Sequence, residues 1–211
     1  MFRERRAALR AWQAARLQRT HDELLQSKRF HDAAVFFLTD LYGPTDLSRH
    51  IEDVRRLAPV MARTLPEVGV TAIAHAVELN ALSEDLDGAM VEALDAEAAQ
   101  ISDAAYAAAY RKVGRAEDRE HQIDLIALLG GALEALSRQR FVGAALWAMR
   151  KPAQAAGLGD LQGFIERGYA AFAAMRGGAG EFVGIVVARE RALSKALLEG
   201  DDGALQRSAE S

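Results

Sequence analysis

Apolar residues recur at helical spacing along most of the chain, and the clearest case runs from Phe30 to Leu47. Apolar positions at i, i+3, i+4 and i+7 predict a short helix with one buried face, and Gly43-Pro44 then ends it. Thr45 or Asp46 can cap a following helix. Aromatic side chains dominate core energetics, so we expect this segment to be a packing hub. Four of the fourteen aromatic residues fall here: Phe30, Phe36, Phe37 and Tyr42.

The same spacing predicts helices over the rest of the chain. Thr64 and Glu67 have capping-box spacing before the longest one, and Pro59 interrupts the helix before it. Ser102 is positioned to cap a later helix that ends at Gly114. The predicted helices cover residues 3–27, 65–98, 103–113, 116 onward, 161–175 and 182–199, with a turn or short helix at 141–150.

Glycines and polar segments divide this helical pattern. Gly130-Gly131 falls inside a predicted helix, where each glycine costs about 1 kcal/mol relative to alanine, so we expect a close helix crossing there. Residues 151–160 form the clearest internal break, and residues 200–211 are polar and expected to fray. We therefore predict an all-α fold, a single globular bundle of eight or nine helices over residues 1–199 with a tail at 200–211.

Composition narrows the classes of protein that the chain can belong to. The net charge of −4 gives no general case for nucleic-acid binding, and the absence of cysteine excludes disulfides and thiolate metal sites. No apolar run reaches the roughly 18 residues of a membrane span, and no secretory signal is found, so we expect a cytoplasmic, bacterial-type protein. Residues 1–29 hold eight Lys or Arg against three acids. This basic helix could touch a membrane surface or an acidic partner, but we expect it to be structural.

Histidine offers the most specific candidate chemistry. His75 shares a stripe with leucines and should point inward, with Glu78 one turn later. His121 and Asp124 repeat this spacing of an imidazole and a carboxylate on another helix. If the two helices face each other, His75, Glu78, His121 and Asp124 could bind zinc or iron. A single inward histidine is more often satisfied by a neighbouring carboxylate or carbonyl. Haem ligation by His75 is a weaker alternative, because no attachment motif is present.

The residues from Phe36 to Leu47, with Ile51, Pro59-Val60-Met61 and the segment His75 to Leu82, resemble a group of uncharacterised bacterial all-helical proteins. The resemblance rests on the aromatic-Leu-Tyr-Gly-Pro corner and covers about residues 20–198. It implies a single helical domain and brings no known activity, cofactor or catalytic residue.

No other motif indicates catalysis. No serine lies in Gly-x-Ser-x-Gly, and the glycines at 177–180 lack the lysine of a phosphate-binding loop. The residues identify no cofactor and do not decide whether the chain is an enzyme. The leading hypothesis is a non-catalytic soluble protein that acts through protein contacts or self-association, as a homodimer. The alternative is a metal- or haem-dependent enzyme that uses inward-facing His75 and His121 with Glu78 and Asp124.

Overall fold

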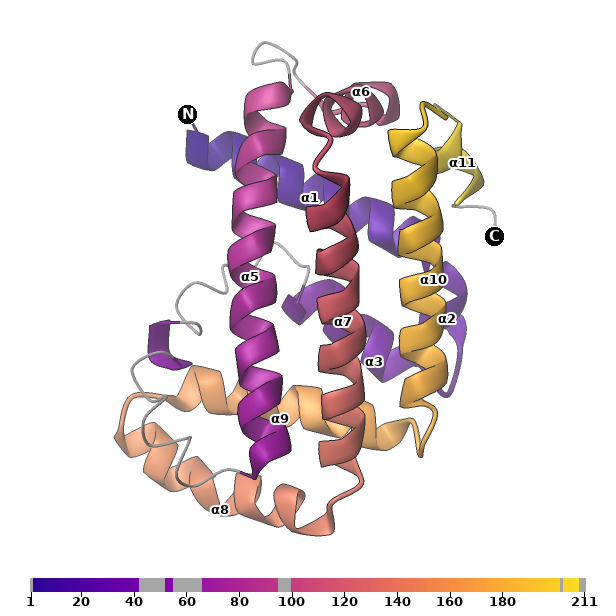
Figure 1. Cartoon of the computed structure of the whole chain (residues 1–211). Helices are drawn as coiled ribbons and strands as arrows, with labels where there is room; N and C mark the ends of the chain where they lie inside the picture. The colour runs from indigo at the N-terminus through magenta and orange to yellow at the C-terminus, as the bar shows by residue number, and fades with distance from the viewer. Residues whose placement is uncertain (1, 42–51, 55–65, 95–99, 202, 209–211) are drawn as a thin grey trace.

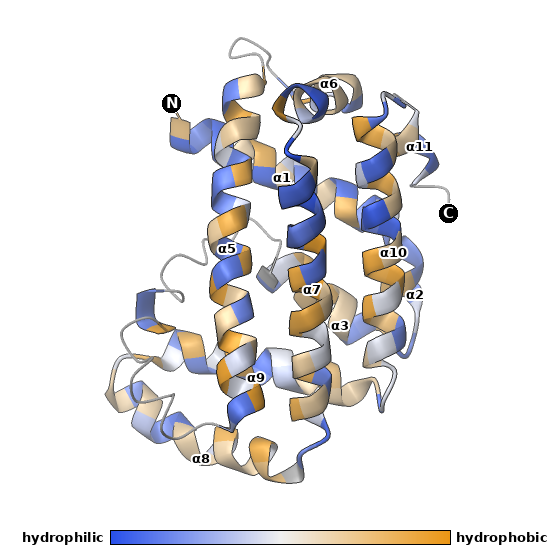
Figure 2. Cartoon of the chain, in the orientation of Figure 1, coloured by the Kyte–Doolittle hydropathy of each residue, from blue (hydrophilic) through white to orange (hydrophobic). Residues whose placement is uncertain are grey.

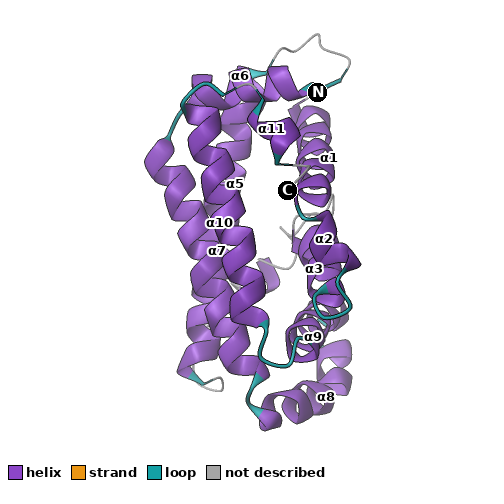
Figure 3. Ribbon diagram, turned by 90° about the vertical axis from the view of Figure 1, so that its right-hand side faces the viewer, coloured by secondary structure: helices purple, strands orange, loops and turns teal. Residues whose placement is uncertain are grey.

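The chain folds into helices, as the spacing of its apolar residues predicts (Figure 3). This computed structural model describes residues 2–41, 52–54, 66–94, 100–201 and 203–208, and these ranges contain no strand. The predicted all-α fold class is therefore confirmed. The corner at Gly43-Pro44, the caps at Thr45 or Asp46 and Thr64, and Pro59 lie outside the described residues.

The helices form two layers, which Figures 1 and 3 show from two sides. One layer holds α5 (Glu67–Ala93), α7 (Ala116–Ser137) and α10 (Ala179–Leu198), which lie side by side with α7 in the middle. The other layer crosses behind them and holds α1 (Phe2–Thr20), α2 (Asp22–Gln26), α3 (His31–Phe36), the π-helix η1 (Phe37–Leu41) and α9 (Gly159–Ala174). One end of the molecule carries α6 (Asp103–Val113) and α11 (Ala204–Arg207), and the other carries α8 (Arg140–Ala155).

The ends of α6 lie where the sequence places them. Ser102 is the N-cap, and its Oγ accepts a hydrogen bond from the backbone N–H of Ala105 at 3.2 Å. Gly114 follows the helix with φ of +63°, a conformation that side chains rarely adopt. These two residues confirm the predicted bounds, because each supplies a local interaction that needs no tertiary contact.

Other helix ends differ from the prediction. The helix expected at 3–27 breaks at His21, whose buried ring contacts α10. Pro66, with φ of −62° and ψ of 153°, is the N-cap of α5, so Glu67 is its first residue and has no capping-box role. Pro152 lies inside α8, which continues to Ala155 across the break expected at 151–160. Within the tail expected to fray, α11 buries Leu205.

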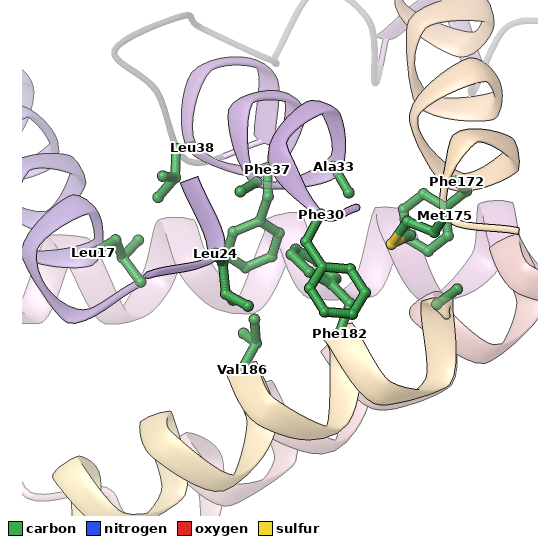
Figure 4. Packing of buried hydrophobic residues seen from close by; sticks show 12 residues of the cluster. Leu17, Leu24, Phe30, Ala33, Phe37, Leu38, Phe172, Met175, Phe182 and Val186 are labelled. Atoms are coloured by element: carbon green, nitrogen blue, oxygen red, sulfur yellow. The ribbon is translucent and has the colours of Figure 1, made fainter. Parts of the chain in front are cut away.

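The predicted aromatic hub is one of two apolar clusters. Phe30 and Phe37 are buried and contact Phe182 of α10, with ring centroids 5.9 and 6.3 Å away, as Figure 4 shows. Met175, at the end of α9, is fully buried in the same cluster. Phe36 is also buried, and its ring lies 5.4 Å from that of Phe164. The hub therefore joins α3 and η1 to α9 and α10.

The second cluster fills the opposite end of the molecule, and the sequence did not single it out. Leu9, Met90 and Leu205 are almost fully buried there, with α6 contributing Tyr106. Trp12 stacks on the Tyr106 ring with centroids 4.0 Å apart. The core therefore extends beyond the aromatic hub, because α1, α6, α10 and α11 converge on this second cluster.

Gly130 explains how α7 packs against α10. A Cβ built at Gly130 would lie 2.5 Å from Cγ2 of Val183, so only glycine fits at this crossing. A Cβ at Gly131 would meet nothing within 4 Å. The expected close crossing is therefore found at the first glycine of the pair.

Candidate functional site

The structure brings together two of the four predicted metal ligands. Nε2 of His121 on α7 lies 2.8 Å from Oε1 of Glu78 on α5. Both side chains are about half exposed, at 51% and 54%, so His121 does not point inward as predicted. The buried side of α7 instead follows Ile123, Leu125 and Leu129. An exposed pair of this kind contributes little to stability, because water competes for both partners.

The other two predicted ligands do not complete a metal site. Asp124 pairs with Arg191 of α10, with Oδ1 2.7 Å from the guanidinium. His75 is half-buried on α5, and in the described part of the chain no three His, Cys, Asp or Glu side chains group closely enough to hold a metal ion. The metal- or haem-dependent alternative therefore stays a prediction of the sequence.

A buried charged network, which the sequence did not reveal, links α1 to α10. Nη1 of Arg16 donates to both oxygens of Glu190, at 2.5 and 2.6 Å, and Nε2 of the buried His21 lies 3.1 Å from Oε1 of the same carboxylate. Burial alone would raise the pKa of Glu190, but Arg16 and His21 outweigh it and lower that pKa to about 2. Glu190 therefore stays ionised near neutral pH.

A second buried polar group lies at the junction of α6, α7 and α10. The hydroxyl of Tyr110 is 2.8 Å from that of Ser194, and burial raises the pKa of Tyr110. The guanidinium of Arg119 lies over the Tyr110 ring, 4.5 Å from its centroid, which is a cation–π geometry. Arg119 is 5% exposed, and its Nε and Nη2 atoms have no hydrogen-bond partner among the residues that the structure describes.

The network of Arg16, His21 and Glu190 lies between the two apolar clusters and is structural. On α1, Arg16 lies between Leu9 of one cluster and Leu17 of the other, and on α10 Glu190 lies between Val186 and Leu193. A carboxylate with a pKa of about 2 is a poor general base near neutral pH, since such a base works best with a pKa close to the pH of the reaction. The network therefore positions α1 on α10 and offers no accessible reactive group.

Two open depressions on the surface are small for ligand sites. One, of about 200 Å³, lies between α10 and α11 and includes Thr20 and Ser208 in its lining. The other, of about 280 Å³, lies between α3 and α9, where Arg167 and Asp40 form an ion pair. Small-molecule sites usually enclose roughly 300–1,000 Å³, so neither depression has the usual shape of a substrate pocket.

Among the described residues, helix α8 packs mainly against α9, along one side. A Cβ at Gly143 would lie 3.1 Å from the ring of Tyr169, so α8 passes close to α9. The side-chain amide of Gln162 donates to the carbonyl oxygen of Leu146 at 2.8 Å, and Arg150 pairs with Glu166 at 2.7 Å. These contacts fix which face of α8 points away from α9.

The outward face of α8 is apolar, and Figure 2 shows hydrophobic colours along most of this helix. Trp147 is 70% exposed, Phe141 60% and Met149 52%, three of the six exposed large apolar side chains found in the described residues. The exposed small residues around them are Ala144, Ala145, Ala148 and Pro152. Large exposed apolar patches usually mark a surface that contacts another molecule. We call this surface, made of Phe141, Ala144, Ala145, Trp147, Ala148, Met149 and Pro152, the α8 face.

The sequence contains a signal for the α8 face, but Pro152 predicts that the helix ends before that residue. The segment from Arg140 to Ala155 contains no acidic residue and segregates its apolar and basic positions. The prediction ends this element at Arg150 and makes it a turn or short helix. Because the helix runs to Ala155, the exposed apolar positions extend to Pro152, with the exposed Lys151 beside them.

Comparisons with known proteins match the chain to one family and leave its activity open. Within the described ranges, no single helix has the length and apolar composition of a membrane span, and α9 and α10 pass that test only when taken together across a bend of 102°. Residues 1–204 match the protein-family model described as Domain of unknown function (DUF8198). No curated protein and no solved structure matches the chain.

Proposed function

Because the chain belongs to this family of unknown function, we propose a role that rests on its own surface. It acts by binding an apolar helix of a protein partner along the α8 face, and not by catalysis. The observation that carries the proposal is the exposure of Phe141, Trp147 and Met149 on one helix whose other side is held by α9.

The composition of the α8 face suits a protein contact. Aromatic residues and Met are enriched in protein interfaces, and tryptophan is among the residues that most often dominate their binding energy. Full burial of a side chain such as Phe141 contributes roughly 1.5–3 kcal/mol relative to leaving it in water. Between these large residues, Ala144, Ala145 and Ala148 keep the backbone of α8 accessible, so that another helix can approach closely.

Charge favours a protein over a lipid surface as the partner. Segments that recognise anionic lipids carry clusters of roughly four to eight Lys or Arg. Helix α8 carries three basic residues, Arg140, Arg150 and Lys151, and Arg150 is already neutralised by Glu166 at 2.7 Å. This charge is too small to hold the helix on an anionic membrane.

A photo-crosslinking amino acid placed at position 147 tests the proposal in cells. Because Trp147 is 70% exposed, this substitution should leave the fold unchanged. We expect one defined adduct with a protein that mass spectrometry identifies, and we expect Phe141→Asp to abolish it. The matched control places the same crosslinker at Phe2, which is 47% exposed on α1, away from α8. Equal crosslinking from both positions, or an adduct with lipid alone, would contradict the proposal.

A further inference from the structure

We infer that the partner of the α8 face is a second copy of this chain, bound so that the two α8 helices pack antiparallel about a two-fold axis. The inference rests on the proposed function and names its partner. It follows from the order of large and small residues along α8, from the positions of its charges, and from the size of the face.

The order of residues on α8 makes the face complementary to itself. Phe141, Ala145, Ala148 and Pro152 follow one another at i, i+4, i+7 and i+11, so they share one stripe of the helix, and all four are exposed. An antiparallel copy centred between Ala145 and Ala148 places Phe141 against the partner's Pro152. The same register places Ala145 against the partner's Ala148.

This register places the other large residues at the two edges of the contact. Met149 lies on one flank of the stripe, and Ala144 and Trp147 lie on the other. Because a two-fold axis places each flank against the same flank of the partner, the two Trp147 side chains lie at nearly the same height along one edge of the contact. Along the central stripe, the large Phe141 therefore meets the smaller Pro152, and small residues meet small ones. A two-fold contact of this kind uses the same surface on both subunits and closes at the dimer.

The charges of α8 do not oppose this arrangement. The segment has no acidic residue, so no carboxylate is buried when the two faces meet. Lys151 lies 4.5 residues from the centre, which puts the two lysines about 13 Å apart along the helix axes. That separation exceeds the Debye length of about 10 Å at 0.1 M salt, so their repulsion is largely screened. Arg150 keeps its pairing with Glu166 of its own subunit.

The size of the face predicts a weak dimer. Helix α8 has 16 residues and is therefore about 24 Å long. Stable interfaces bury about 800 Å² on each partner, and a single pair of short helices provides less. We therefore expect a dissociation constant of roughly 10–100 μM, in the range of transient contacts.

Sedimentation velocity of the purified chain over a concentration series tests the inference. We expect the mean sedimentation coefficient to rise from that of a monomer toward that of a dimer. Phe141→Asp should weaken association at least about tenfold, whereas Phe2→Asp, an equally charged change at an exposed phenylalanine of α1, should leave it unchanged. A monomer at every concentration, or a dimer that Phe141→Asp does not affect, would overturn the inference.

Because the chain contains no cysteine, engineered disulfides can test the register on a clean background. The variants Ala145→Cys and Ala148→Cys, mixed and oxidised, should form a mixed disulfide faster than either forms with itself. A control variant, Ala188→Cys at an exposed position of α10, should remain monomeric. Preferential pairing of either variant with itself would refute the antiparallel register.

The outcomes separate this inference from the proposed function. If the purified chain stays monomeric while the crosslinker at position 147 captures one defined different protein, the proposed function stands and the second copy is excluded. If neither experiment shows a protein contact and anionic vesicles bind the chain in a manner lost in Phe141→Asp, both are overturned in favour of a lipid surface.

Discussion

The close crossing of α7 and α10 at Gly130 leads to a prediction about stability, and the next residue, Gly131, supplies the control. Gly130→Ala adds a Cβ that would lie 2.5 and 2.9 Å from the two methyl groups of Val183 and 3.2 Å from its Cβ. Rotation of Val183 cannot relieve all three contacts, so the two helices must separate. Gly131→Ala adds the same methyl group to the same helix with nothing within 4 Å.

The difference between the two variants isolates the cost of the contact. Replacing glycine by alanine inside a helix stabilises it by about 1 kcal/mol at either position. Overpacking at a tight contact costs typically about 1–3 kcal/mol, and only Gly130→Ala should show this loss. We therefore expect Gly131→Ala to be more stable than Gly130→Ala by roughly 1–3 kcal/mol, the cost of the contact.

Urea denaturation of the two variants measures this difference. Adding Val183→Ala to Gly130→Ala should recover most of the loss, because it removes the two methyl groups that clash. The reasoning is refuted if Gly130→Ala and Gly131→Ala unfold at the same urea concentration, since α7 and α10 would then not touch at this glycine.

Three further predictions concern the buried network and a helix cap. Arg16→Met should cost about 3–5 kcal/mol in urea denaturation, because it removes the guanidinium that pairs with the Glu190 carboxylate inside the protein, and adding Glu190→Leu should restore part of the loss. The pKa of Glu190 is lowered from 4.5 to about 2. The ionised Glu190 carboxylate therefore stabilises the fold above about pH 5, and this stabilisation is lost as the pH falls toward 2. This stabilisation is at most about 3 kcal/mol. In melting curves, Glu190→Gln should therefore lose less stability between pH 5 and 2 than the parent protein does. Ser102→Ala should lower the unfolding free energy by about 1 kcal/mol, and an unchanged value would show that the Ser102 hydrogen bond to Ala105 is not formed in solution.

Local signals in the sequence were sufficient to predict several elements. Ser102 and Gly114 fix the ends of α6 through a side-chain hydrogen bond and a positive φ, which depend only on neighbouring residues. Phe30 and Phe37 indicated a core because large aromatic residues at helical spacing are rarely left exposed. Gly130 indicated a close crossing because glycine is otherwise unfavourable inside a helix.

The identity of the distant residues that meet in the fold could not be predicted. Nothing near Arg16 in the chain indicates that Glu190, 174 residues later, meets it in the core. His121 was assigned to the interior from its spacing, but α7 packs between α5 and α10, and the remaining outward strip of the helix holds the histidine. Leu205 lies in a polar tail and is buried only because α11 folds back against α10.

The exposure of Trp147 tests the central claim most directly. Trp12 is the only other tryptophan, and Trp12→Phe keeps a ring on Tyr106 while leaving Trp147 as the sole indole fluorophore. In a dilution series of this variant, we predict red-shifted, readily quenched emission at low concentration and a blue shift with protection from acrylamide as the concentration rises through roughly 10–100 μM. Emission that stays red-shifted and fully quenchable at every concentration would contradict the burial of the α8 face by a second copy.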